Sequence, residues 1–277
     1  MQISTKKFLE NCKTYIAKSL AGEETYEYAA VFTLGKAKCE SMSGKPFAEA
    51  ASLMEAGRLF TRAEENLQTT SAFSSGELLE NGLSCFLKAA KIYDSCMAFT
   101  HAANCYIFAG DTLWKFKKLS EAIKVYSLAA DIFCRDAPRV THILMKCLKI
   151  YVISRDYSSA LNTVFKIQTL MLDARDKLKV IEIYRVLLVL FTLPPKSKAI
   201  SKDGPMSLLA YIGENNEITR DSIAKYLDED LFLAYTSEDL NSLDITASFL
   251  QAYLDSTQRD ILQDLVEQAT NPSDDIL

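Results

Sequence analysis

The sequence predicts an all-α fold in which antiparallel helix pairs form a solenoid, arranged as a single continuous stack. Apolar residues recur three and four positions apart along most of the chain, and a helix start signal appears about every 15 to 20 residues. The 277 residues include only 9 Gly and 6 Pro, too few for the tight turns of a β-sandwich or barrel. With 49% hydrophobic and 24% charged residues, the chain can bury a sizeable core, so wholesale disorder is excluded.

Capping residues and prolines predict where successive helices begin. Two runs that are β-prone by themselves, residues 149–153 and 186–191, sit inside longer runs of helical period and are predicted to be helical. The start signals, in chain order, are Ser4, Pro46 before residues 47–50, Ser75 before Glu77, Ser120 before Glu121, Pro138 before residues 139–153, Asp156 before residues 157–172, and then Thr219, Asn241 and Ser256.

A weak internal repeat indicates that these helices form pairs. The segments Ala56–Phe60, Ala89–Tyr93 and Ala129–Phe133 each place a ring four positions after a small residue, and they recur 33 and then 40 residues apart. The small residue lets two helices approach closely and the ring fills the space beside it. The intervals are near those of helical-pair repeats, so a degenerate tetratricopeptide-like solenoid is favoured over a plain helical bundle.

The prolines suggest how the chain is organised. Residues 1–193 are expected to form the helical solenoid, and residues 194–205 a linker that holds three of the six prolines. Residues 206–277 are expected to form acidic helices that pack on the same stack, since so short a segment makes only a small domain unaided.

Charge is distributed unevenly along the chain. The net charge is −5, but residues 1–213 carry +7 and residues 214–277 carry −12. This polarity favours a basic protein surface as a partner and disfavours nucleic acid, and a merely solubilising acidic surface is the alternative. The candidate partner-binding carboxylates are Asp228, Glu229, Asp230, Glu238, Asp239, Asp255, Asp260 and Asp264.

Catalytic and metal-binding signatures are missing from the sequence. The two histidines, His101 and His142, have no second ligand at metal-binding spacing and are interpreted as ordinary helix-face residues. Cys105 lies four residues after His101, but such a pair also needs an oxyanion site and an orienting group. We therefore expect a non-enzymatic protein with no catalytic residue, no metal and no cofactor.

The cysteines and the N-terminus bear on location. Seven cysteines without a C-x-x-C pair are typical of free thiols in a reducing compartment. No apolar segment follows the first lysines, and the run from Val186 to Phe191 is too short to span a bilayer. We expect a cytoplasmic protein without a membrane span, with early-endosome association and a nuclear pool as further expectations.

Several segments resemble the family of the 40-kDa huntingtin-associated protein, also called the factor VIII intron 22 protein. No single segment is a sharp motif, and the resemblance rests on their order and spacing. They are Glu55–Glu64, Ser154–Leu161, Arg185–Leu190 leading into Pro194 and Pro195, Asp230–Leu233, Leu254–Gln258 and Thr270–Ser273.

The resemblance implies a tetratricopeptide-like α-solenoid that binds huntingtin, a HEAT-repeat protein, in a near-stoichiometric stabilising complex. It also implies a link to early-endosome and vesicle traffic through a small GTPase. Vertebrate-type relatives carry a long Pro-rich and Gly-rich insertion where this chain has a short linker, which puts any function of that insertion in doubt here.

A second resemblance is to the soluble attachment proteins of vesicle fusion, adaptors that present SNARE bundles to a hexameric ATPase. The shared features are length, acidity, helical-pair architecture and motifs such as Ala102–Tyr106. The proline break before the C-terminal helices and a poor match at the C-terminal end count against it.

Overall fold

The computed structural model describes residue 11 and residues 26–70, 74–134, 136–170, 175–192, 231–237 and 239–270. Every regular element in these ranges is a helix, and they contain no strand. The all-α prediction is therefore confirmed, as is the prediction that the two β-prone runs are helical. They lie in α7 (Ala137–Ile153) and α9 (Arg175–Thr192).

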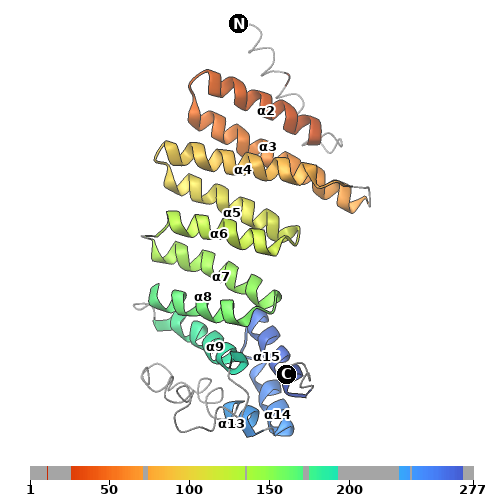
Figure 1. The fold of residues 1–277 in the computed structure, drawn as a ribbon, viewed down its shortest axis with the longest axis vertical. Coiled ribbons are helices and arrows are strands. Elements are labelled where there is room, and N and C mark those ends of the chain that lie inside the picture. The colour runs from red at the N-terminus through yellow and green to blue at the C-terminus, as the bar shows by residue number, and fades with distance from the viewer. Residues whose placement is uncertain are drawn as a thin grey trace, which may run out of the picture. The chain divides into compact units, whose positions relative to one another are not determined.

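The chain divides into two compact units, residues 1–143 and 144–277, with the boundary inside α7. In the first unit each helix packs antiparallel against the next, and Figure 1 shows the turns alternating between two edges of the layer. This is the predicted helix-pair solenoid. Its helices before α7 are α2 (Tyr26–Met42), α3 (Pro46–Thr69), α4 (Glu77–Ser95), α5 (Phe99–Lys115) and α6 (Leu119–Ile132).

Small residues at the helix crossings hold the first unit together. Ala56, Ala89 and Ala129, the small residues of the predicted repeat, are fully buried, and Phe60, Tyr93 and Phe133 are buried beside them. The 40-residue interval joins equivalent helices, α4 and α6. The 33-residue interval joins the consecutive helices α3 and α4, so the first copy is not in phase with the other two.

Four of the connections between helices are the same three-residue turn. The middle residue has a left-handed backbone, with φ of 65° at Gly44, 58° at Met97, 59° at Lys117 and 56° at Arg155. In each turn the amide of that residue and the next amide donate to carbonyls of the preceding helix, as at Met97 to Asp94 and Ala98 to Tyr93. This Schellman geometry closes one helix and starts the next immediately, which keeps consecutive helices antiparallel.

Helix starts were predicted more accurately than the residues that cap them. Pro46 occupies the first turn of α3, and Asp156 caps α8 (Tyr157–Leu170) by accepting from the Ser159 amide at 3.0 Å. The predicted Ser75 cap is wrong, because α4 starts at Glu77 with Gly76 as its N-cap.

The other misplaced caps lie one or two residues from the true ones. α6 begins at Leu119 with Lys118 before it, so Ser120 lies inside its first turn. α14 (Leu240–Leu250) is capped by Asp239 and α15 (Ser256–Thr270) by Asp255, in place of the predicted Asn241 and Ser256. Aspartate accepts from helix amides as well as serine and asparagine do, so a sequence offering several such residues does not single one out. Ser4 and Thr219 lie outside the described residues.

The second unit contains the rest of α7 together with α8, α9, α13 (Phe232–Ser237), α14 and α15. α8 packs on α9, α9 on α15, and α15 on α14. Their shared core includes Leu148, Val164, Leu187, Leu250 and Leu265, all fully buried. The acidic C-terminal helices are thus joined to the helix pair α8–α9 through an apolar interface.

Two further predictions are not tested by the described residues. The predicted linker at 194–205 lies outside the described residues, and the predicted domain boundaries stay a prediction. Among the residues that the structure describes, no helix is both long and apolar enough to cross a membrane.

The repeated turn leads to a stability prediction. Lys117→Gly should raise the free energy of unfolding by about 0.5–1 kcal/mol, because glycine adopts φ near 59° without the steric cost that a Cβ brings. Gly44→Ala should lower it by about 1 kcal/mol for the converse reason. Urea denaturation followed by circular dichroism measures both changes.

The control places the same substitution within a helix. Lys124 is exposed in α6, where Lys124→Gly should lower the free energy of unfolding by about 1 kcal/mol. Equal losses at Lys117 and Lys124 would mean that the left-handed turn does not limit stability.

Candidate partner-binding groove

A groove opens between α2, α3 and α4 of the first unit and encloses about 410 Å³. Its floor is apolar: Leu53 belongs to the buried core that includes Ala37 and Ala89, and Leu34 and Ile92 pack against that core. The full lining is Leu34, Ala37, Lys38, Ser41, Glu49, Leu53, Lys88, Lys91 and Ile92. Because each wall is a helix of the repeat array, the groove is fixed by the same packing that forms the fold.

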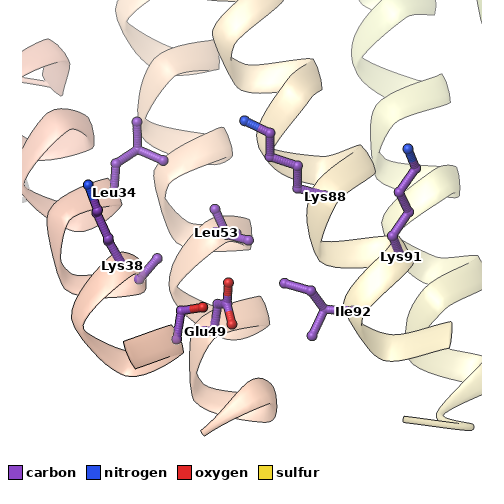
Figure 2. A pocket seen from close by; sticks show the side chains of 9 residues that line it. Leu34, Lys38, Glu49, Leu53, Lys88, Lys91 and Ile92 are labelled. Atoms are coloured by element: carbon purple, nitrogen blue, oxygen red, sulfur yellow. The ribbon is translucent and has the colours of Figure 1, made fainter. Parts of the chain in front are cut away.

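The groove has a basic rim. Lys38, Lys88 and Lys91 are exposed, and Figure 2 shows their ammonium groups pointing to one side, away from the Glu49 carboxylate. None of these three lysines forms an ion pair with a described residue. A segment with carboxylates beside an apolar side chain would therefore gain both charge pairing on the rim and burial on the floor.

One carboxylate near the groove, that of Glu40, already has partners within the protein. Glu40, on α2, accepts a hydrogen bond from the Ser52 hydroxyl at 2.5 Å and lies 3.8 Å from the Lys36 ammonium. This leaves Glu49 as the acidic group of the groove lining.

The predicted acidic partner site is only partly described. Asp228, Glu229, Asp230 and Glu238 lie outside the described residues. The other four, Asp239, Asp255, Asp260 and Asp264, all belong to the second unit, and the structure gives them different roles.

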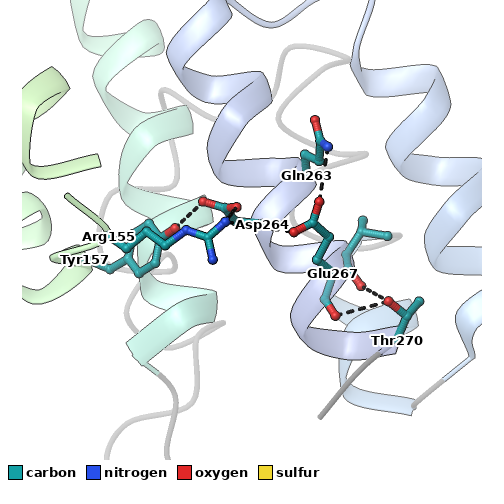
Figure 3. A network of polar contacts seen from close by, with 7 residues as sticks. Arg155, Tyr157, Gln263, Asp264, Glu267 and Thr270 are labelled. Atoms are coloured by element: carbon teal, nitrogen blue, oxygen red, sulfur yellow. Dashed lines mark hydrogen bonds and ion pairs between the residues drawn. The ribbon is translucent and has the colours of Figure 1, made fainter. Parts of the chain in front are cut away.

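Asp264 makes its contacts within the protein (Figure 3). Its carboxylate lies 2.9 Å from the Arg155 guanidinium and accepts a hydrogen bond from the Tyr157 hydroxyl. Burial, together with the acceptor and charge of Asp264, raises the pKa of Tyr157. We call Arg155, Tyr157 and Asp264 the α15 latch, because they join α15 to α8 and the turn before it.

Asp255 is also used within the protein. It accepts from the Gln258 amide at 2.9 Å, while the Gln258 side chain accepts from the Asp255 amide at 3.0 Å, which makes a reciprocal cap of α15. The Tyr184 hydroxyl donates to the same carboxylate, and burial and Asp255 raise the pKa of Tyr184.

Asp239 and Asp260 remain at the surface. Asp239 caps α14, and its hydrogen bonds from the Ser242 hydroxyl and amide lower its pKa. Asp260 is exposed on α15. Asp255 is exposed as well, but its carboxylate accepts from Tyr184 on another helix, so among the described candidates Asp239 and Asp260 are the more available to a partner.

The thiols and histidines show no nucleophilic arrangement within the described residues. Burial raises the pKa of Cys85, Cys105 and Cys147 to about 11, so each is a protonated, apolar side chain at neutral pH. The His101 ring contacts Tyr93, with centroids 5.2 Å apart. In the part of the chain that the structure describes, no three His, Cys, Asp or Glu side chains gather to hold a metal ion.

A comparison with known families bears on the whole helical array. The family model of the soluble NSF attachment proteins matches residues 12–192, which is more than half of the chain. The chain belongs to the soluble NSF attachment protein family. No curated protein matches the chain.

The family match includes the groove and ends at the last residue of α9. It supports the second resemblance of the sequence analysis, the attachment protein, better than the first. The finer resemblance, to the 40-kDa huntingtin-associated protein, is not confirmed, and its C-terminal segments fall beyond the match.

The groove lysines of this attachment-family chain were missed by the sequence analysis. The sequence predicts a partner site in the acidic C-terminal region, although residues 1–213 carry a net +7. Within α4 a signal was present, since Lys88 and Lys91 flank the buried pair Ala89 and Ala90 and must share the solvent side of the helix. Lys38 comes from another helix, so its proximity requires the tertiary structure.

The α15 latch leads to a prediction about the second unit. Asp264→Asn removes the ion pair and the charged acceptor of Tyr157, and should lower the free energy of unfolding by about 1–2 kcal/mol. Asp260→Asn, on the exposed side of the same helix, should change it by less than about 0.5 kcal/mol. Urea denaturation of the two variants gives the comparison, and equal effects would mean that the latch contributes nothing.

Alkaline titration gives a second measure of the latch. The folded-state pKa of Tyr157 is raised, so its stabilising contribution is complete below the unfolded tyrosine pKa of about 10 and declines as pH rises above it. When the pH is raised from neutral to above about 10, the free energy of unfolding should therefore fall less in the Tyr157→Phe variant than in the parent protein. The same decline in both proteins would contradict this assignment.

Proposed function

We propose that the protein is a non-enzymatic adaptor of the vesicle-fusion type, which binds a helical SNARE-type bundle and presents it to a hexameric ATPase. The observation that carries the proposal is the family match across the helix-pair array, residues 12–192. The proposed location is the cytoplasm and the surface of vesicles or early endosomes, with a nuclear pool as a further option, and no catalytic step is assigned to it.

The groove supports this proposal chemically. A helix of a bundle presents apolar side chains three and four residues apart, with charged residues beside them. The apolar floor at Leu53 and Ile92 fits such a stripe, and the rim of Lys38, Lys88 and Lys91 selects helices with acidic flanks. Lysine is suited to this role as a mobile charge that adapts to carboxylates at different positions.

The lysine rim provides the test. The double variant Lys88→Glu/Lys91→Glu should weaken binding of an assembled SNARE bundle by at least about tenfold and reduce its salt dependence, because two attractive contacts become repulsive. Surface plasmon resonance at two salt concentrations measures both effects.

A matched variant controls for the total charge. Lys124→Glu/Lys149→Glu makes the same change at two exposed lysines that do not line the groove. Its affinity should stay within about twofold of the parent protein. If both doubles weaken binding equally, net charge is responsible and the groove is not the contact.

A second candidate function is partnership with huntingtin, with a small GTPase as a further partner. It is favoured by the segment Leu254–Gln258, which resembles the huntingtin-associated family and lies beyond the attachment-protein match. In the structure this segment builds the reciprocal cap at the start of α15. Parallel pull-downs with huntingtin and with the ATPase plus SNARE bundle separate the two, and capture of huntingtin alone would overturn the adaptor proposal.

We also propose that the acidic C-terminal region docks on a basic partner surface, with exposed carboxylates steering the encounter. Asp239 and Asp260 are accessible for this contact, as is Asp244 on α14, whereas Asp255 and Asp264 are engaged within the protein. Asp228, Glu229, Asp230 and Glu238 remain candidates from the sequence.

Replacing exposed aspartates with asparagine distinguishes electrostatic steering by the acidic region from a merely solubilising role of that region. Asp244→Asn/Asp260→Asn should slow association with the ATPase by roughly twofold to fivefold at low salt, and the difference should vanish at high salt. The control Glu80→Gln/Asp131→Asn removes two exposed carboxylates of the first unit and should leave the rate unchanged. Unchanged rates in both variants would favour the solubilising role.

A further inference from the structure

Helix α14 carries apolar side chains on two opposite faces. Leu243, Ala247 and Leu250 are buried in the core of the second unit. On the other side of the helix, Ile245 is 71% exposed and Phe249 is 47% exposed. The neighbouring α15 exposes no large hydrophobic side chain along its described length. A surface helix normally keeps its apolar residues on the buried face, so the second apolar face of α14 indicates a contact with another molecule.

The exposed face continues past the end of α14. Tyr253, in the turn that follows, is 53% exposed, and its ring centroid lies 5.4 Å from that of Phe249. Ile245, Phe249 and Tyr253 follow one another at intervals of four residues, the spacing that places side chains on one side of a helix. We call these three residues the α14 stripe.

The surroundings of the α14 stripe are acidic. Residues 231–270 contain seven carboxylates and a single basic residue, Arg259. Two exposed carboxylates directly precede exposed apolar side chains, in the pairs Asp239–Leu240 and Asp244–Ile245. Helix α14 therefore combines carboxylates with apolar side chains, which is the chemistry that the groove of the first unit is suited to bind.

The groove offers the complementary surface. Three lysines and one glutamate surround its apolar floor, and the lysines form no ion pair with a described residue. At about 410 Å³ it has room for a few side chains of a docked helix, but not for the helix itself. Docking would bury Ile245 on this floor and pair Asp244 with the lysine rim. Since one chain carries both surfaces, a second copy is always present as a partner.

We propose that the protein associates with itself head to tail, the α14 stripe of one copy docking in the groove of a second copy. Because the two surfaces differ, a pair of copies keeps one unused groove and one unused stripe, so the assembly extends beyond a dimer. The contact is small, at or below the roughly 1,200 Å² that marks transient interfaces, so the association is weak and reversible. It does not rest on the proposed adaptor function.

Sedimentation velocity of the full chain tests this contact over a range of protein concentrations. The mean mass of the parent protein should rise from monomer to beyond dimer with concentration, and high salt should reduce it. The groove variant Lys88→Glu/Lys91→Glu and the stripe variant Asp244→Asn/Ile245→Ser should each associate at least about tenfold more weakly. Circular dichroism verifies that both variants are folded.

Mixing the two variants gives the decisive measurement. The groove variant retains its α14 stripe and the stripe variant retains its groove, so one contact of the parent type can form between them. An equimolar mixture should therefore form a dimer with one copy of each variant. It should form no larger species, because the two surfaces that remain are both altered.

Two controls make the same kinds of change elsewhere in the chain. Lys124→Glu/Lys149→Glu reverses the charge of two exposed lysines that do not line the groove. Leu128→Ser/Asp131→Asn alters an exposed leucine and an exposed carboxylate of α6. Both controls should associate within about twofold of the parent protein.

Three outcomes overturn the proposal. The parent protein stays monomeric at every concentration, or either variant associates as well as the parent, or the mixture of the two variants stays monomeric. Association of the groove variant alone would mean that the α14 stripe pairs with a surface other than the groove.

The stripe variant separates this proposal from the adaptor function. It should lose self-association but bind the SNARE bundle at least as tightly as the parent protein, because its groove is intact. If the parent and the stripe variant both fail to bind the bundle while the mixture still forms its dimer, the adaptor function fails and the self-association stands.

Discussion

Close approach of neighbouring helices is the constraint on which the first unit depends. A Cβ on Gly57 would stand 2.5 Å from the Phe86 ring, and a Cβ on Gly110 would stand 2.6 Å from the Tyr126 ring. Gly82 in turn faces the Gly57 carbonyl, at 3.1 Å from its own hypothetical Cβ. In each pair the missing side chain of one helix is replaced by the ring or backbone of the next, so the helix spacing cannot widen without opening a cavity.

The groove follows from this spacing as well. With α2, α3 and α4 packed through alanines such as Ala37, Ala50 and Ala89, the longer side chains on their flanks have no room inside the layer. Lys38, Lys88 and Lys91, which stand beside buried alanines, are therefore exposed on the face of the layer. The groove surface thus arises from the same packing that forms the core.

The sequence predicted the helices well because their signals are local. Period, alanine–aromatic pairs and residues such as Pro46 and Asp156 act within one or two turns of the chain. The turns were missed because Met97, Lys117 and Arg155 occupy left-handed positions where glycine is the usual signal, and Schellman bonds hold them there.

The groove was missed because Lys38 reaches Lys88 and Lys91 only through tertiary packing. Of the predicted carboxylates, Asp264 is paired with Arg155 from 109 positions away, which no local pattern reveals.

The carboxylates of the second unit and the lysines of the groove differ in how far their charges are already paired within the protein. Asp264 is paired with the Arg155 guanidinium and accepts from Tyr157, and Asp255 accepts from Tyr184, so both carboxylates make their contacts within the second unit. The lysines of the groove have no such partner among the described residues, so their charge is fully available. Recognition at the groove should then depend on salt concentration more strongly than the attachment of α15, because buried Ile261, Leu262 and Leu265 hold α15 in addition to its charged hydrogen bonds. Salt concentration thus separates the contacts made by carboxylates within the second unit from the contacts that the groove lysines offer to a partner.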